Sequence, residues 1–148
     1  MAIDALGKPA GAWCEHCAIG SGCRIYETRP GECRDFLCEW LTTPVLPDAF
    51  RPDRTKVVLV RHPDGALAAH CDTANPMAWR KEPVYSLLKR YAAESWGSPA
   101  KVLARAGHRL WLISPKEDVD LGEVPPGSTY SYAEGPDGKI KATIHPAS

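Results

Sequence analysis

Five of the six cysteines of this chain lie within 25 residues, a density that invites metal chemistry. The first two form a C-x-x-C pair, which can place two thiolates on one ion in a tight turn. Three more follow at wider spacing, so the pattern differs from the repeated pairs of a standard zinc finger. We therefore predict a thiolate metal site with ligands drawn from Cys14, Cys17, Cys23, Cys33 and Cys38.

Helix geometry separates the last two of these cysteines. The sequence predicts a short helix that begins near Pro30 and runs to about Leu41. Cys33 and Cys38 are five positions apart, so in a regular helix they project about 140° from each other and cannot easily share an ion. Cys33 would lie in the first turn, where the helix dipole favours a thiolate. The preferred ligands are Cys14, Cys17, Cys23 and Cys33, with Cys38 as an alternative fourth ligand or a buried thiol.

The stretch from Cys23 to Cys38 reads C-R-I-Y-E-T-R-P-G-E-C-R-D-F-L-C. It resembles the YkgJ family of zinc- or iron-chelating proteins, which carry a C-x-I-Y-x-x-R-P-x-x-C-R-x-F-x-C stretch behind a CxxCxxCC motif. The resemblance implies metal chelation through all five clustered cysteines. It covers about 30 residues, and at residues 18–21 this chain has A-I-G-S where the family's adjacent cysteine pair would fall.

The thiolates that remain are enough for one ion, and structural zinc is the expected cofactor. Iron or an iron–sulfur cluster is the alternative, and thiol redox chemistry or simple burial of the cysteines is a third. His16, inside the C-x-x-C pair, could replace one thiolate, but we expect it to be exposed.

Charge and composition narrow the class of protein. The 148 residues include 18 Lys+Arg and 18 Asp+Glu, and this balance argues against nucleic-acid binding, which depends on a basic excess. The first residues have neither a basic region nor an apolar run, so we expect no signal peptide, no membrane anchor and a cytoplasmic location. Disulfides rarely persist in that compartment, which favours metal over disulfide for the cysteines.

Hydrophobic patterning predicts an α+β fold, an antiparallel sheet of hairpins packed with one long helix. The expected hairpins pair 56–61 with 66–71, 101–105 with 109–113, and 129–133 with 139–144, and the helix covers about 83–96. We divide the chain into a flexible arm (1–12), a cysteine-rich metal-binding module (13–43) and an α+β body packed with it as a single domain (44–148).

Two other constellations have structural interpretations. His70, Cys71 and Asp72 are adjacent, but neighbours in a strand point to opposite faces, so we predict that Cys71 is a small buried residue. The arginines and acids of residues 24–56 predict a salt-bridged surface. Within it, Arg29 and Arg34 are expected to cap carbonyls or to orient thiolates.

The expected function is a non-catalytic metal-binding protein with an interaction or regulatory role and an unidentified protein partner. The first rival is an enzyme or redox protein that uses an iron centre, which would need an open coordination position. The second is a metal carrier, which would need an exposed and exchangeable site.

Overall fold

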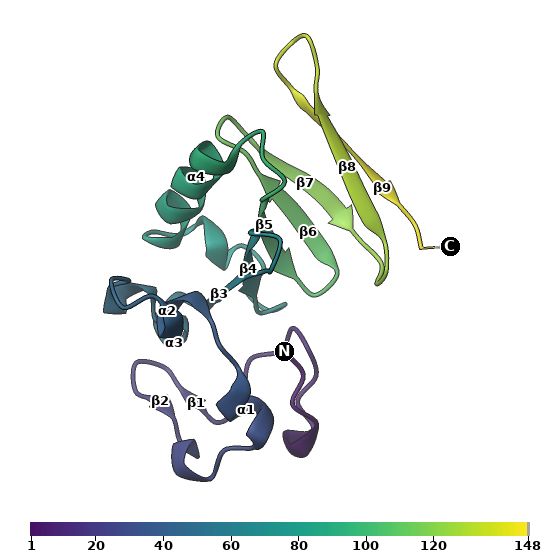
Figure 1. The fold of residues 1–148 in the computed structure, drawn as a ribbon. Helices are drawn as coiled ribbons and strands as arrows, with labels where there is room; N and C mark the ends of the chain where they lie inside the picture. Colours follow the sequence, from purple (N-terminus) through teal and green to yellow (C-terminus); the bar gives the residue numbers. More distant parts are fainter. Residues whose placement is uncertain (148) are drawn as a thin grey trace.

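The computed structural model describes residues 1–147, and its central feature is a five-stranded sheet (Figure 1). The strands follow the order β3-β4-β5-β6-β7, and their bounds are Val57–Arg61, Leu67–Cys71, Val102–Ala106, Arg109–Ile113 and Asp118–Glu123. Helix α4, Val84–Ser95, packs on one face. The hairpin of β8 (Thr129–Glu134) and β9 (Ile140–His145) forms a separate two-stranded sheet.

The helix and the three hairpins confirm the sequence-based expectations in outline. Helix α4 buries Val84, Leu87, Leu88 and Ala92, the spacing of a stripe that faces the core. The β3–β4, β5–β6 and β8–β9 pairs are all antiparallel.

The expectation of an all-antiparallel sheet is wrong at its centre. Strand β5 runs parallel to β4, with His70 opposite Arg105 in the register. The chain leaves β4, passes through α4 and returns beside β4, which makes a β-α-β crossover. Strand β7 extends the sheet beyond β6 and was not expected from the sequence.

Two apolar clusters hold this body together on opposite faces of the sheet. The helix-side cluster centres on Trp79, Leu88 and Trp111, and the two indole rings lie 5.8 Å apart between centroids. The other cluster joins Leu110 and Leu112 of β6 to residues of the β8–β9 hairpin. Strand β6 is therefore buried on both faces, which explains its nearly unbroken apolar run.

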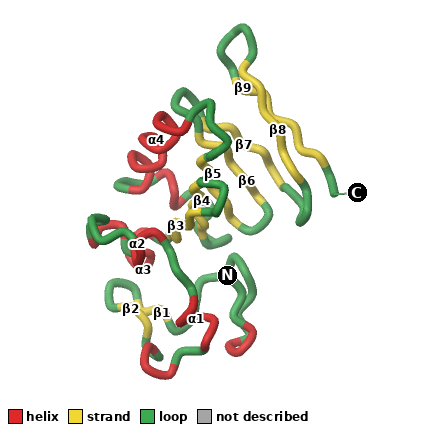
Figure 2. Tube along the Cα trace, viewed as in Figure 1, coloured by secondary structure: helices red, strands yellow, loops and turns green. Residues whose placement is uncertain are grey.

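The N-terminal third consists mostly of loops and short helices (Figure 2). Its elements are β1 (Cys17–Ala18), β2 (Gly22–Cys23), α1 (Gly31–Asp35), α2 (Glu39–Thr42) and α3 (Pro52–Thr55). Short turns of 3-10 helix cover Asp4–Leu6, Tyr26–Thr28, Asp48–Phe50 and Ala78–Arg80.

Helices α2 and α3 attach this part of the chain to the sheet by packing against β3. At the same edge, the guanidinium of Arg61 donates two hydrogen bonds to the carboxylate of Glu39, both 3.2 Å long. Residues 1–12, expected to be a flexible arm, contain a bridge between Ile3 and Lys8, and the side chain of Ile3 is buried. The flexibility of this segment stays a prediction.

Candidate metal centre

The small β1–β2 hairpin holds Cys17 and Cys23, and Cys14 lies in the turn directly before it. The backbone N–H of Cys17 donates to the carbonyl of Cys14 at 3.0 Å, which closes the C-x-x-C turn. Cys17 then lies opposite Cys23 in the β1–β2 register. The N–H of Arg24 donates to the carbonyl of His16 at 2.8 Å. Because hydrogen-bonded and non-hydrogen-bonded pairs alternate, Cys17 and Cys23 form a non-hydrogen-bonded pair, in which side chains approach most closely.

Cys33 joins this group from helix α1, where its N–H donates to the carbonyl of Pro30 at 3.1 Å. Burial raises the pKa of the Cys33 thiol, and the nearby thiols of Cys14 and Cys23 raise it further. Burial also raises the pKa of Cys17, with a smaller contribution from Cys14. Cys33 is therefore near enough to Cys14 and Cys23, and Cys17 near enough to Cys14, for their thiols to influence one another.

Cys38 lies outside the β1–β2 hairpin and outside α1, directly before helix α2. The expected helix over 30–41 is interrupted, because Phe36 and Cys38 have extended backbones between α1 and α2. Cys38 caps the start of α2, where its carbonyl accepts from Leu41 and Thr42, and its side chain is buried. Its surroundings fit the alternative of a buried thiol.

Proximity of the thiols does not by itself make a coordination site. Among residues 1–147, no three or more His, Cys, Asp or Glu side chains are arranged so that they could hold a metal ion. All six cysteines are free, and in the cluster Cys23 is exposed while Cys14, Cys17 and Cys33 are partly exposed. The metal site and its ligands therefore stay predictions.

Two arginine side chains hold the loop before α1 by donating hydrogen bonds to its backbone carbonyls. Arg34 donates to the carbonyls of Arg29 and Glu27 at 3.1 and 3.0 Å, and Arg29 donates to the carbonyl of Tyr26 at 2.5 Å. These bonds confirm the expected capping of carbonyls. Nearby, Arg51 pairs with the buried Asp53 through two bonds of 3.1 Å, as expected of a salt-bridged surface.

His16 and Cys71 are the two remaining residues of interest. The ring of His16 lies 3.6 Å from the carboxylate of Glu15 and is partly exposed. Cys71 is 5% exposed and packs in the helix-side cluster, which confirms its interpretation as a small buried residue. Burial raises the pKa of the Cys71 thiol to about 11, so it carries almost no thiolate at neutral pH.

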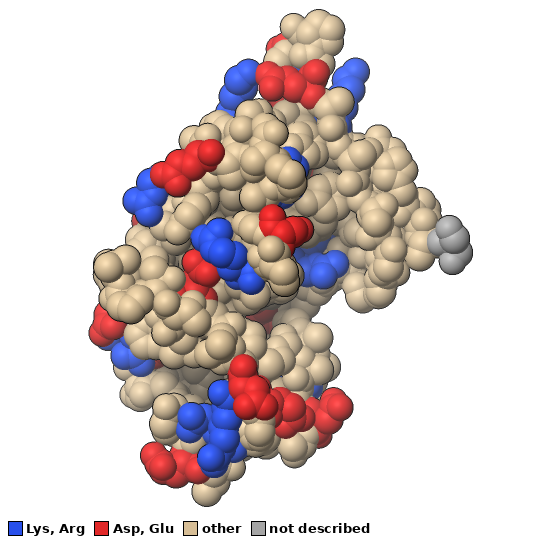
Figure 3. All heavy atoms as spheres, viewed as in Figure 1, with Lys and Arg blue, Asp and Glu red and all other residues tan. Residues whose placement is uncertain are grey.

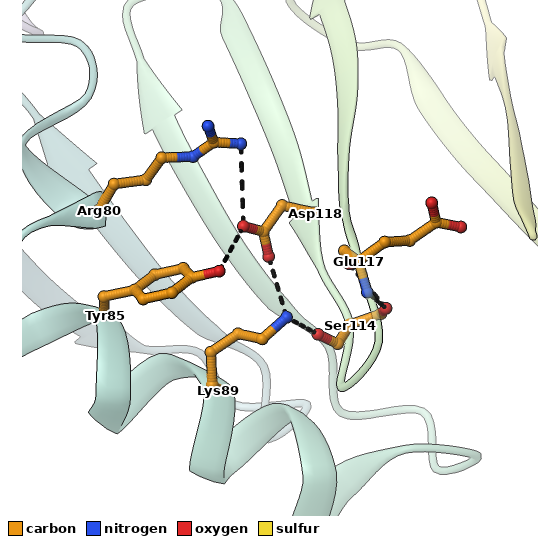
Figure 4. Close-up of polar contacts among 6 residues, drawn as sticks. All are labelled: Arg80, Tyr85, Lys89, Ser114, Glu117 and Asp118. Carbon is orange, nitrogen blue, oxygen red and sulfur yellow. Dashed lines mark hydrogen bonds and ion pairs between the residues drawn. The ribbon is translucent and has the colours of Figure 1, made fainter.

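A polar network that sequence reasoning missed joins α4 to β7 (Figure 4). The carboxylate of Asp118 accepts from the Tyr85 hydroxyl at 2.9 Å and from the Lys89 ammonium at 3.2 Å, and Arg80 lies 3.8 Å away. Lys89 also donates to the carbonyl of Ser114. The only sequence signal was the i, i+4 spacing of Tyr85 and Lys89, whereas their partner is about 30 residues away.

This polar network has a structural role. The hydrogen bond to Asp118 raises the pKa of Tyr85, which makes the phenol a weaker acid than usual. The Asp118 side chain is 7% exposed and has its charge balanced by Lys89 and Arg80. The network fastens the helix to the sheet.

The surface carries no large region of one charge on the face drawn in Figure 3, where basic and acidic side chains are interspersed. Within residues 1–147, no helix is both long and apolar enough to cross a bilayer.

Comparison with known proteins identifies no relative. No family model matches the chain, and neither a curated protein nor a solved structure is significantly similar to it. The resemblance to the YkgJ family therefore rests on the quoted residues alone, and function must be argued from the site.

Proposed function

We propose that Cys14, Cys17, Cys23 and Cys33 bind one zinc ion, and that this ion organises the N-terminal third of a cytoplasmic interaction or regulatory protein. The observation that carries the proposal is the cross-strand pairing of Cys17 with Cys23, one tight turn away from Cys14. The thiols of Cys14 and Cys23 act on the pKa of Cys33, which supports its membership of the same site. Four thiolates match the tetrahedral preference of structural zinc.

Zinc would stabilise a segment that the apolar core does not. The module has little buried apolar surface, with Cys38 its one buried side chain between residues 13 and 43. In such a segment metal binding supplies folding free energy that the apolar core does not. Because the thiols of Cys17 and Cys33 have raised pKa values, zinc must displace their protons, and its affinity should fall steeply as the pH is lowered.

The test compares two cysteine variants after expression under reducing conditions. Native mass spectrometry and elemental analysis should find about one zinc per chain in the wild-type protein. Cys23→Ser should lose the metal and make residues 13–43 sensitive to proteolysis, while the α+β body stays folded. Cys38→Ser is the matched control and should retain the zinc. A wild-type protein without metal, or one with equal zinc in both variants, would contradict the proposal.

One observation favours metal delivery as a second candidate. Cys23 is exposed and the other three thiols are partly exposed, so a bound ion would be within reach of an acceptor. A delivery protein should yield its zinc to a chelator within minutes, whereas a structural site should hold it for hours. A brown protein containing iron and sulfide after purification without oxygen would instead support the redox alternative.

A further inference from the structure

Two side chains on neighbouring parallel strands project from the sheet face opposite α4. His70 of β4 and Arg105 of β5 are partners in the register. The residues on either side of each, such as Cys71 and Ala104, belong to the helix-side cluster. Because side chains alternate along a strand, His70 and Arg105 lie side by side on the other face.

Arg105 has no anionic partner there. Among residues 1–147, its guanidinium forms no ion pair and no hydrogen bond, and its Nε is buried without an acceptor. Other sheet arginines are paired: Arg109 donates to Asp120 at 2.6 Å, and Arg61 binds Glu39. A buried N–H without a partner costs about 1–3 kcal/mol, so such a group usually marks a place for an acceptor from outside the chain.

The surroundings of His70 are positively charged as well. Burial lowers the pKa of His70 to about 4, and the N-terminal amine, Arg105 and His62 all lower it further. No carboxylate is among the groups that act on it. At neutral pH the imidazole is therefore uncharged, and it can donate one N–H while Arg105 supplies the charge.

We propose that Arg105 and His70 form a binding site for an oxyanion, the carboxylate or phosphate group of a small molecule, on the β4–β5 face of the sheet. The guanidinium presents paired N–H donors in a fork that matches two oxygens of such a group. The imidazole adds a donor from the adjacent strand. This site is separate from the thiol group and does not depend on the proposed metal.

The test is a titration of the full chain, as isolated, with sodium phosphate and separately with sodium acetate. The buffer is Bis-Tris chloride at constant ionic strength, and the signals are the ring protons of the histidines in NMR spectra. We expect a saturable shift of the His70 signals with a Kd on the order of 1 mM for at least one of the two anions. The signals of His108 and His145, away from this pair, should not follow the same curve.

Two arginine variants test whether Arg105 belongs to the binding site. Arg105→Gln should weaken binding at least about tenfold, the loss of a charge-assisted hydrogen-bond pair. Arg90→Gln, an exposed arginine on α4, should leave it unchanged. Saturation with phosphate alone or acetate alone identifies the ligand class. If neither anion gives a saturable shift of His70 in the wild-type protein, a result that needs no variant, the proposal fails. It also fails if binding survives in a folded Arg105→Gln protein.

Discussion

Protonation of His70 should destabilise the protein by an amount that follows from its position. Its pKa is lowered from 6.5 in the unfolded chain to about 4 in the fold, mainly by burial and then by neighbouring positive groups. Between these values the unfolded chain binds the proton more tightly, so stability falls as the pH is lowered. A difference of about 2.5 pKa units, at about 1.4 kcal/mol each, amounts to about 3.5 kcal/mol once the shift is fully expressed.

The contribution of His70 is present in full above about pH 6.5, is lost progressively below that value, and is gone below about pH 4. Urea unfolding at about pH 7.5, 6, 5 and 4 measures the free energy of unfolding across this interval. His70→Gln removes the titrating group while leaving every carboxylate, so the variant corrects for acids that lose their partners in the same range. We expect the wild-type protein to lose about 3 kcal/mol more than the variant across the interval. Equal losses in the two proteins would show that water reaches His70 and would refute the reasoning.

Two further predictions concern buried groups of the body. Cys71, with its pKa raised to about 11, should react with an alkylating reagent far more slowly than a free thiol near pH 8, and Cys71→Ala should cost only about 1 kcal/mol in urea unfolding. Fast alkylation that disappears in Cys71→Ala would contradict this. Asp118→Asn should cost about 1–3 kcal/mol because Lys89 loses its charged partner, and the pKa of Tyr85 should fall toward its usual value in an ultraviolet-absorbance titration. An unchanged Tyr85 pKa would show that Asp118 does not control it.

Local patterns predicted the body of this protein well. The apolar stripe of α4 and the hairpin pairing of 56–61 with 66–71 depend on residues within a few positions of one another, and the structure follows both predictions. The pairing of β4 with β5 was missed because a parallel neighbour is chosen by packing across the whole crossover. Strand β7 was missed because its sequence, D-V-D-L-G-E, is polar, as suits a strand near the edge of the sheet.

The candidate metal centre was predictable only in part. Clustering of the thiols near residues 14–33 follows from the C-x-x-C turn and the hairpin, both of which are local. Helix geometry was the reason to set Cys38 apart as a ligand, but the expected helix is broken at Phe36 and the Cys38 side chain is buried, so that assignment stays a prediction. Unpaired Arg105 left no sequence signal, since the lack of a partner is a property of the folded neighbourhood.

Each of the two outer strands of the sheet, β3 and β7, contacts an element outside the sheet. An outer strand presents a row of unpaired peptide groups to which another molecule could add a strand. Strand β3 is contacted by α2 and α3 (Figure 1). Strand β7, at the other end of the sheet, contacts β9. The cover over β3 belongs to the same third of the chain as the clustered cysteines. Loss of order in that third would therefore expose the β3 edge to strands of other molecules.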